Sequence, residues 1–308
     1  MSGLRRVGWM AFLLAALYSV PVAAEEAGRD GGVRPRIISL YAAHTEVLLR
    51  LGARENIIGV SRQETYAGPE TEGWKPEIFS IRDDVEKYLA AKPDIILARP
   101  QHIAGSGHLR NALDKAGIRM IALQVTNADG LYGYWRELGA LVGREKEAEE
   151  LVARFDATVE RYRTASKRLT RRPGVFVEAM HREVKTFTPD SIPAWMVELC
   201  GGRYVASDAE PATPGVIIAD YGPERLLARS GEIDVFISQE GAMNRVALET
   251  VRERNIYQPI RAFKEGRVYK IPEDRLARPT PSLAEGMKML AEWTGLDVEM
   301  SDEIPNGD

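Results

Sequence analysis

The sequence predicts an α/β protein of two lobes with parallel sheets, joined by one long rigid helix, with a cleft between the lobes. Short β-branched runs alternate with amphipathic segments along the whole chain, which is the pattern of βα units. One segment in the middle, 143–169, has no Gly or Pro in its interior and carries a continuous apolar stripe. The 308 residues, 44% of them apolar, are enough for roughly two domains with a buried core each.

The N-terminal residues 1–24 have the order of a secretory signal peptide. Arg5 and Arg6 precede the apolar run 7–20, and small residues follow Pro21. The run is shorter than a membrane-spanning helix requires, although an uncleaved anchor is the alternative. Because no cysteine lies near the cleavage point, a lipid-modified N-terminus is not expected. We therefore expect a periplasmic protein that is soluble after cleavage of the signal peptide.

The first lobe is expected over residues 34–142. Its four predicted strands are 36–40, 56–60, 94–98 and 119–124. Its predicted helices lie near 44–51, 84–91, 108–116 and 130–141. After the second strand, the segment 61–80 is expected to form a long loop that carries aromatic side chains near the strand ends.

The connecting helix is expected over residues 143–170. Apolar residues recur along it at spacings of three and four: Leu151, Phe155, Val159, Tyr162, Ala165 and Leu169. At 1.5 Å per residue the helix would be ~40 Å long, which is enough to bridge two lobes as a stiff strut.

The second lobe is expected over residues 173–298 and repeats the scheme. Its predicted strands are 175–179, 203–206, 234–238 and 268–271. Its predicted helices lie near 191–199, 223–228, 245–253 and 282–293. The segments 84–97 and 222–237 share one order, a short helix that opens with an acid, a turn and a buried strand, which supports two equivalent lobes.

Composition and motifs exclude several classes of function. The formal net charge of −4 argues against a nucleic-acid or anionic-membrane partner held by charge alone. The single cysteine, Cys200, excludes a disulfide framework and any cysteine-rich metal site, so a metal would be held by His, carboxylate, Tyr or Met. The chain also lacks a Gly-x-Ser-x-Gly elbow, a Walker loop and a Gly-x-Gly-x-x-Gly turn after its first strand. We therefore do not expect an enzyme.

Three histidines follow predicted strands, at the sheet edge where ligands of open α/β sheets bind. His44 and His102 belong to the first lobe and His181 belongs to the second. Neutral imidazole suits Fe, Co, Ni and Zn, so the three rings are candidate metal ligands, while the alternative for each is a helix cap or a local hydrogen bond. Further candidates for ligand binding lie just beyond predicted strands: Tyr41, Arg62, Arg99, Gln101, Arg182, Gln239, Met243 and Arg278. The arginines among them could clamp carboxylates.

Several motifs resemble the periplasmic binding proteins for iron-siderophores, haem and cobalamin. The resemblance covers residues 34–295 and rests on segments that occur in the same order: IISLYAAHTE (37–46), EKYLAAKPDIIL (86–97), LCGG (199–202), ERLLARS (224–230) and Arg278-Pro279 before a final helix. It implies two α/β lobes joined by a rigid helix and a metal chelate bound in the cleft. It also implies an ABC-type permease as partner, with Glu86 and Glu224 as the docking acids.

One departure from this family bears on the ligand. Many members have a small or amide residue where this chain has His44, and with His102 and His181 the rim is richer in histidine than an organic siderophore needs. We therefore expect a monomeric, non-catalytic receptor for a metal chelate or metal ion, such as an iron-siderophore, haem or a corrinoid. These histidines are candidates for direct ligation of its metal, and a chelate clamped by the arginines is the alternative. No catalytic cofactor is expected. The alternative is a periplasmic metal-dependent enzyme or metallochaperone that uses the same histidines.

Overall fold

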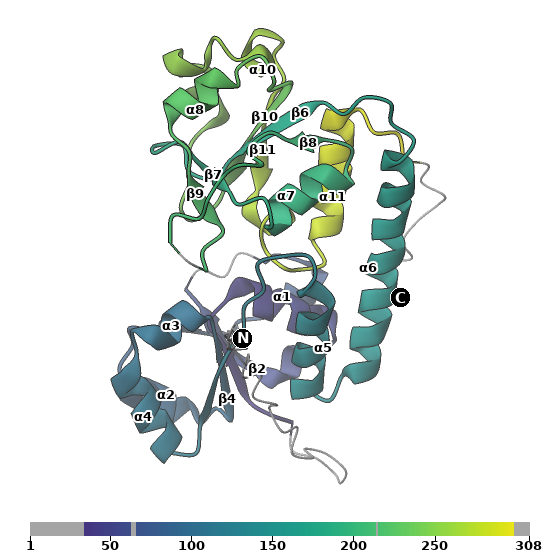
Figure 1. The fold of residues 1–308 in the computed structure, drawn as a ribbon. Coiled ribbons are helices and arrows are strands. Elements are labelled where there is room, and N and C mark those ends of the chain that lie inside the picture. The colour runs from purple at the N-terminus through teal and green to yellow at the C-terminus, as the bar shows by residue number, and fades with distance from the viewer. Residues whose placement is uncertain (1–33, 63–65, 214, 299–308) are drawn as a thin grey trace, which may run out of the picture. The chain divides into compact units, whose positions relative to one another are not determined.

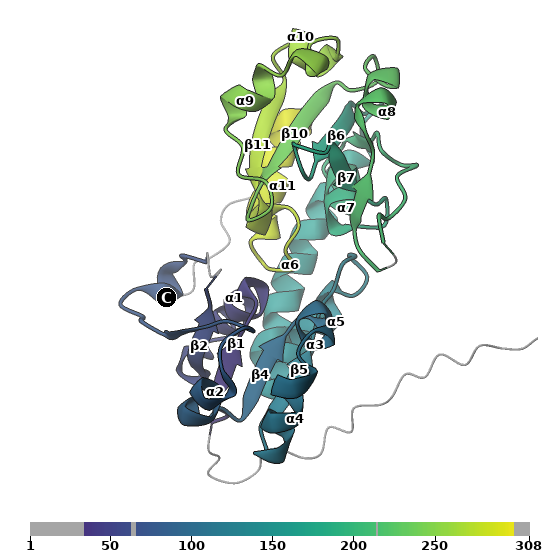
Figure 2. The same cartoon turned by 90° about the vertical axis from the view of Figure 1, so that its left-hand side faces the viewer.

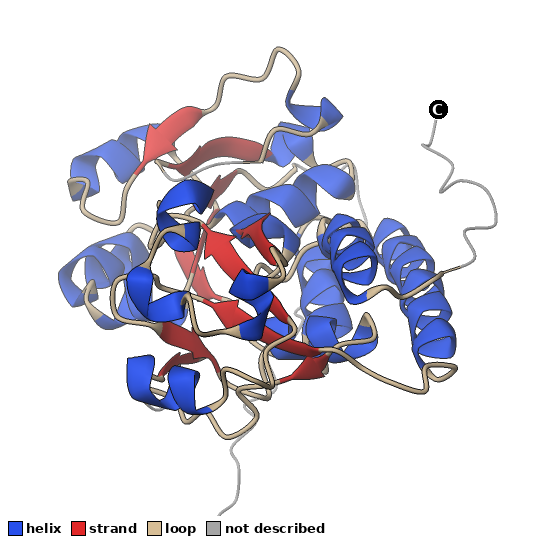
Figure 3. Cartoon of the chain, turned by 90° about the horizontal axis from the view of Figure 1, so that it is seen from above, coloured by secondary structure: helices blue, strands red, loops and turns tan. Residues whose placement is uncertain are grey.

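The computed structural model describes residues 34–62, 66–213 and 215–298, so the predicted signal peptide, 1–24, lies outside the described residues. Two parallel sheets, one in each half of the chain, and one long helix between them confirm the predicted fold class (Figure 1). Seen from another side, the strands lie among helices (Figure 3). Within the described ranges, no helix is both long and apolar enough to cross a membrane.

The first sheet has five parallel strands in the order β3-β2-β1-β4-β5. The strands are β1 (Ile37–Ser39), β2 (Ile57–Ser61), β3 (Glu77–Phe79), β4 (Ile95–Ala98) and β5 (Arg119–Ala122). The prediction of a loop over 61–80 is wrong at β3. This edge strand has only three residues and exposes Glu77 and Ile78, so it shows neither an apolar run nor a clear alternation.

Both faces of the first sheet are covered, which explains its nearly continuous apolar strands. Successive side chains of a strand point to opposite faces, so Ile37 joins one buried cluster and Ile38 joins the other. The covering helices are α1 (Ala42–Arg50), α2 (Val85–Ala91), α3 (Pro100–Ala104), α4 (Gly107–Lys115) and α5 (Leu131–Leu141), with short 3-10 turns at Arg54–Asn56 and Pro69–Thr71. The helix α3 was not predicted, because a single turn leaves no apolar periodicity.

The connecting helix α6 spans Glu145–Ser166. The predicted stripe is confirmed: Leu151, Phe155, Val159, Tyr162 and Ala165 are buried, and Leu169 packs beyond the helix end. This stripe faces elements of both halves, since α6 contacts α5 of the first lobe and two helices of the second, α7 (Ile192–Leu199) and α11 (Leu283–Thr294) (Figures 1 and 2). The apolar face of α6 therefore packs against the cores of both lobes.

The second lobe is built on a parallel sheet in the order β11-β10-β6-β8. Its strands are β6 (Gly174–Glu178), β8 (Arg203–Tyr204), β10 (Val235–Glu240) and β11 (Val268–Pro272). An unpredicted antiparallel pair, β7 (Lys185–Phe187) and β9 (Ile218–Asp220), lies beside it. The remaining helices are α8 (Pro223–Ala228), α9 (Leu248–Arg252) and α10 (Arg261–Lys264), with 3-10 turns at Asn255–Tyr257 and Glu273–Arg275.

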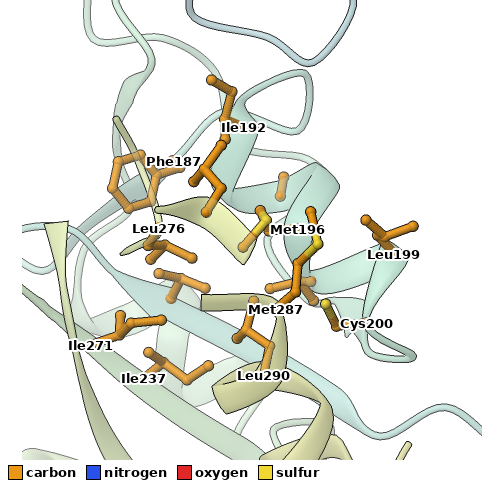
Figure 4. Packing of buried hydrophobic residues seen from close by; sticks show 14 of the residues in the cluster. Phe187, Ile192, Met196, Leu199, Cys200, Ile237, Ile271, Leu276, Met287 and Leu290 are labelled. Atoms are coloured by element: carbon orange, nitrogen blue, oxygen red, sulfur yellow. The ribbon is translucent and has the colours of Figure 1, made fainter. Parts of the chain in front are cut away.

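The core of the second lobe packs α7 and α11 against its sheet. Figure 4 shows Met196 of α7 and Met287 of α11 among Ile237 and Ile271 of the strands. Cys200 follows α7 and is fully buried in the same cluster. Burial raises the pKa of its thiol, so Cys200 acts as a small apolar residue here.

Hydrogen bonds join the two lobes beside α6. The indole N–H of Trp135 in α5 donates to the carbonyl of Pro279 at 2.9 Å. The backbone N–H and the hydroxyl of Ser282, which precedes α11, both donate to one carboxylate oxygen of Glu46 in α1, at 3.1 and 2.6 Å. Glu46 is buried, and burial raises its pKa while the bonds from Ser282 oppose that shift. The segment before α11 is thus fixed to the first lobe.

Candidate functional site

Each sheet has one position at which the strand order reverses. In the first sheet the chain continues from β1 to β2 and β3 on one side and to β4 and β5 on the other. In the second sheet, β8 lies on one side of β6, and β10 and β11 lie on the other. Ligands of open α/β sheets bind beyond the carboxyl ends of the strands at such points. The relevant edges are therefore the ends of β1 and β4, and the ends of β6 and β10.

A hollow of about 650 Å³ lies at the first of these points, within the size range of small-molecule sites. Its walls come from residues at or just after the ends of β1, β2, β3 and β4: Leu40, Ser61, Arg62, Phe79, Ser80, Ile81, Arg82, Asp83, Arg99 and His102. All of these residues belong to the first lobe. Two of the sequence-predicted arginines, Arg62 and Arg99, and the predicted His102 therefore share one hollow.

The hollow is cationic. Among the described residues that line it, three carry guanidinium groups and one, Asp83, carries a carboxylate, which Lys87 binds at 2.8 Å. The hydrogen bond from Lys87 holds the pKa of Asp83 below its usual value, so this carboxylate stays ionised but already has a cationic partner. The positive charge of the three guanidinium groups is therefore not neutralised by Asp83 and favours a ligand with carboxylate or other anionic groups.

Tyr41 and Arg99 stack where the strand order reverses. The guanidinium carbon of Arg99 lies 4.7 Å from the centroid of the Tyr41 ring, a cation–π arrangement. Burial raises the pKa of Tyr41 to about 12, against the lowering effect of the charges on Arg99 and Arg278, so its phenol is neutral at pH 7. Arg278 is itself buried and pairs with Glu273 at 3.5 Å. The second lobe thus contributes charged groups near Tyr41.

His44 lies in the core of the first lobe. Its side chain is fully buried in α1, and its Nε2–H donates to the carbonyl of Leu123 at 3.0 Å. Burial lowers the pKa of His44 to about 3, so the ring is neutral throughout the physiological range. The rings of Tyr41 and Tyr134 lie 5.2 and 5.8 Å from its centroid. This geometry favours the alternative role for His44, a core histidine with a local hydrogen bond.

His102 lines the hollow, and one nitrogen of its ring already has a backbone partner. Its Nδ1 accepts the backbone N–H of Arg99 at 3.4 Å, across the first turn of α3. Burial and the charge of Arg99 lower the pKa of His102, so the ring is neutral and its proton is on Nε2. A protonated nitrogen has no lone pair for a metal, whereas it can donate a hydrogen bond to an oxygen of a ligand.

His181 occupies the corresponding point of the second lobe, three residues after β6. Its Nδ1 lies 3.1 Å from both carboxylate oxygens of Glu178, the last residue of that strand. Glu178 is completely buried and also accepts the hydroxyls of Ser238 at 2.8 Å and Tyr257 at 2.5 Å. Because Nδ1 faces the carboxylate, Nε2 is the ring nitrogen that is left to bind a ligand. The His181 side chain is 15% exposed, so a ligand can reach it.

The three histidines predicted as metal ligands do not lie together in this structure. Among the described residues, no group of three or more His, Cys, Asp or Glu side chains is arranged to hold a metal ion. The physical reason is that the partners of the three rings differ. His44 is buried and bonded to the carbonyl of Leu123, and Nδ1 of His102 accepts the backbone N–H of Arg99. Of the three rings, only that of His181 contacts a carboxylate, that of Glu178.

The other predicted residues have different exposures. Arg182 is exposed beside His181, and Met243 is 59% exposed in the turn after β10. Gln239 is buried at the end of β10, and its Oε1 has no partner among the described residues. The two predicted docking acids, Glu86 and Glu224, are exposed in the first turns of α2 and α8.

The buried residues that contact His181 and Glu178 were not predicted from the sequence. Glu178 carried a usable signal, since it is the one charged residue at the end of the apolar run of β6 and lies three positions before a histidine. Ser238, Asn244 and Tyr257 carried none, because they lie 60 to 79 residues away from the groups that they bind.

Comparison with known proteins agrees with this architecture. Residues 37–275 match the family model described as periplasmic binding protein. An ABC transporter substrate-binding lipoprotein of Bacillus subtilis strain 168, YvrC, is 25% identical over 261 residues, which cover 83% of this chain and 79% of the relative. A vitamin B12-binding protein of Vibrio campbellii is 24% identical over 236 residues, 74% of this chain and 79% of the relative.

Solved structures show the same fold. A possible iron-binding (periplasmic solute-binding) protein of Staphylococcus epidermidis aligns with a TM-score of 0.70 and 27% identity, over 84% of this chain and 98% of that one. The apo form of a periplasmic haem-binding protein of Roseiflexus, RhuT, aligns with a TM-score of 0.68 and 20% identity, over 85% and 98%. The family consists of binding proteins, not enzymes. The chain therefore belongs to the periplasmic binding protein family and is a substrate-binding protein of an ABC transporter.

Proposed function

We propose that this protein binds an anionic metal chelate with an exchangeable axial position, such as haem or a corrinoid, and delivers it to an ABC-type permease. The observation that carries the proposal is the pair formed by His181 and Glu178. A carboxylate behind Nδ1 fixes the tautomer of a metal-binding histidine and raises the basicity of the other nitrogen. The Nδ1–carboxylate distance of 3.1 Å and the partial exposure of His181 fit this role.

The cationic hollow of the first lobe supports an anionic ligand. Arg62, Arg82 and Arg99 lie around it, and the neutral ring of His102 offers an N–H donor. Guanidinium groups bind carboxylates through paired hydrogen bonds, so carboxylate substituents of a chelate are the groups that this hollow suits. In this proposal His102 recognises the ligand without binding the metal, and His44 supports the fold.

Two related proteins bind ligands of this class by name, a vitamin B12-binding protein and a haem-binding protein. We extend that chemistry to this chain on the basis of His181 and the arginines. Export to the periplasm by the signal peptide at 1–24, and docking to the permease through Glu86 and Glu224, complete the proposed route. Both acids lie on exposed helix turns outside the residues that line the hollow.

Binding of defined probes tests the ligand class. The exported protein is titrated with ferric haem, aquocobalamin and cyanocobalamin while the absorption spectrum is recorded. Coordination by His181 replaces the exchangeable water of aquocobalamin or enters the open position of ferric haem, and either change shifts the spectrum. Cyanide holds the corresponding position of cyanocobalamin, so that probe is expected to show no such shift.

Variants assign the spectral change to one residue. His181→Ala is expected to remove the shift and to weaken binding about tenfold or more. His108→Ala is the matched control, because His108 is an exposed histidine on α4 that does not line the hollow, and it is expected to keep the axial spectrum. An unchanged spectrum in His181→Ala, or no binding of ferric haem and aquocobalamin by the unaltered protein, would refute the proposed ligand class.

A further inference from the structure

We propose that Glu178 is a positioning residue, which holds His181 with its proton on Nδ1, and that Tyr257 acts through Glu178 to tune the strength of Nε2 as a metal ligand. This inference rests on the proposed function, because it assigns a purpose to a buried network behind the metal-binding histidine. Neither residue is among the lining residues of the hollow in the first lobe. Both act through His181.

The network is centred on the carboxylate of Glu178. Three groups converge on it: Nδ1 of His181 at 3.1 Å from both oxygens, the hydroxyl of Ser238 at 2.8 Å from Oε2, and the hydroxyl of Tyr257 at 2.5 Å from Oε1. A carboxylate that is 0% exposed cannot exchange these partners for water. Nδ1 of His181 therefore stays protonated and donates a hydrogen bond to the Glu178 carboxylate.

The direction of the Tyr257 hydrogen bond follows from its second partner. Nη1 of Arg254 donates to the Tyr257 hydroxyl at 2.9 Å, so the oxygen accepts there and its own hydrogen points to Glu178. Tyr257 thus competes with His181 for the same negative charge. A stronger hydrogen bond from Tyr257 to Glu178 weakens the hydrogen bond between His181 and Glu178. Loss of the Tyr257 hydroxyl strengthens the bond between His181 and Glu178.

The backbone of His181 is also held by hydrogen bonds. The N–H of His181 donates to Oδ1 of Asn244 at 3.0 Å, and its carbonyl accepts from Arg254. Three residues later, the buried Val184 has φ of +53°, which is a rare and costly conformation for a β-branched residue. The carbonyl of Val184 accepts the N–H of Gly222 at 3.1 Å, which helps to hold this turn. These contacts fix the backbone from His181 to Val184, from which the imidazole projects toward Glu178.

A merely structural network makes a different prediction from a positioning network. If the buried groups only stabilise the second lobe, removal of Glu178 or Tyr257 lowers the free energy of unfolding and leaves the bound metal unaffected. If they tune His181, the two removals change the metal in opposite directions. Glu178→Gln removes the negative charge beside Nδ1 and lowers the basicity of Nε2. Tyr257→Phe removes a competing donor, strengthens the hydrogen bond from Nδ1 to Glu178 and raises the basicity of Nε2.

The first measurement needs no ligand. Nitrogen-15 NMR of the ligand-free protein reports which nitrogen of His181 carries the proton. We expect the Nδ1–H form in the unaltered protein and in Tyr257→Phe, and a shift toward the other tautomer in Glu178→Gln. An Nε2–H form in the unaltered protein would overturn the inference, whether or not any probe binds.

The second measurement uses ferric haem as the probe. Glu178→Gln is expected to weaken binding 10- to 100-fold and to raise the midpoint potential of the bound iron, and Tyr257→Phe to lower that potential. Tyr204→Phe is the matched control, because the Tyr204 hydroxyl is buried in the same lobe and, within the described part of the chain, bonds only to Thr186 and Phe187. It is expected to lower stability without changing the potential.

The outcomes separate the inference from the proposed function. If His181→Ala removes axial coordination but Glu178→Gln and Tyr257→Phe leave affinity and potential as in the unaltered protein, the inference is wrong and the proposed function stands. If His181→Ala changes nothing, both fail. Where Glu178→Gln does not fold, Ser238→Ala replaces it, since removing the Ser238 donor should move the potential in the same direction as Tyr257→Phe.

Discussion

Replacement of His44 should remove a large part of the acid sensitivity of the fold. The imidazole is fully buried, and burial lowers its pKa from 6.5 to about 3. In the unfolded chain the same ring takes up a proton near pH 6.5. Protonation of the unfolded state therefore favours unfolding as the pH falls from 6.5 toward 3, while above 6.5 the group has little effect.

The magnitude follows from the two pKa values. Between pH 7 and pH 4.5 the unfolded state gains about 2.5 kcal/mol from proton binding at this one site, because almost no native molecules are protonated there. His44→Gln keeps a side-chain N–H that can reach the carbonyl of Leu123 but removes the titration. The difference in free energy of unfolding between the variant and the unaltered protein should then change by about 2.5 kcal/mol over this range.

Urea unfolding at pH 7, 5.5 and 4.5 measures this difference. His108, which is exposed on α4, provides the matched control, and His108→Gln is expected to keep the acid sensitivity of the unaltered protein. A difference between His44→Gln and the unaltered protein that stays constant across the three pH values would refute the burial argument. It would also restore His44 as a candidate ligand, since a ring that titrates normally is open to solvent.

The remaining predictions concern docking, ligand charge and the single thiol. Charge reversal at both Glu86 and Glu224 should abolish import while ligand affinity stays within a factor of a few, as measured by uptake assays beside binding titrations; a loss of affinity would instead assign these acids to the site or the core. Arg99→Gln should weaken ferric haem about tenfold but leave its dimethyl ester unaffected, because the ester has no carboxylate for a guanidinium to bind; equal losses for both probes would contradict a carboxylate contact. Cys200 should react with a thiol reagent only in denaturant, since its side chain is buried and its pKa is raised, and rapid labelling of the native protein would contradict that burial.

Periodicity was sufficient to predict the parts of the fold that are long or wholly apolar. The stripe of α6 extends over five turns, and β6 and β10 are apolar runs bounded by turn residues, so each pattern repeats often enough to be recognised. The strands β3, β7 and β9 were missed. Unlike the equally short β1, whose three residues are all buried, each of them contains a charged residue. Their formation depends on a neighbouring strand that supplies hydrogen bonds, which no local pattern reveals.

The position of His44 could have been predicted by the same periodicity. In α1, Val47 and Leu48 lie three and four residues after His44, so the three side chains share one face of the helix, and Val47 and Leu48 are plainly apolar. That face is the buried one. The strand-end rule indicated the correct edge of the sheet but not the direction of the side chain, and the helix that begins at Ala42 turns His44 inward.

The three histidines show why residue type and position alone do not assign a metal ligand. Whether a histidine can bind a metal depends on which ring nitrogen already has a hydrogen-bond partner and on whether that partner is a donor or an acceptor. A carbonyl fixes the proton of His44 on Nε2, a backbone N–H leaves the proton of His102 on Nε2, and a carboxylate holds the proton of His181 on Nδ1. Of these, only the last leaves a lone pair on the nitrogen that points away from the protein partner at a solvent-accessible site. The carboxylate that makes the difference is itself held by a tyrosine 79 residues away, so the assignment depends on the tertiary fold of the second lobe.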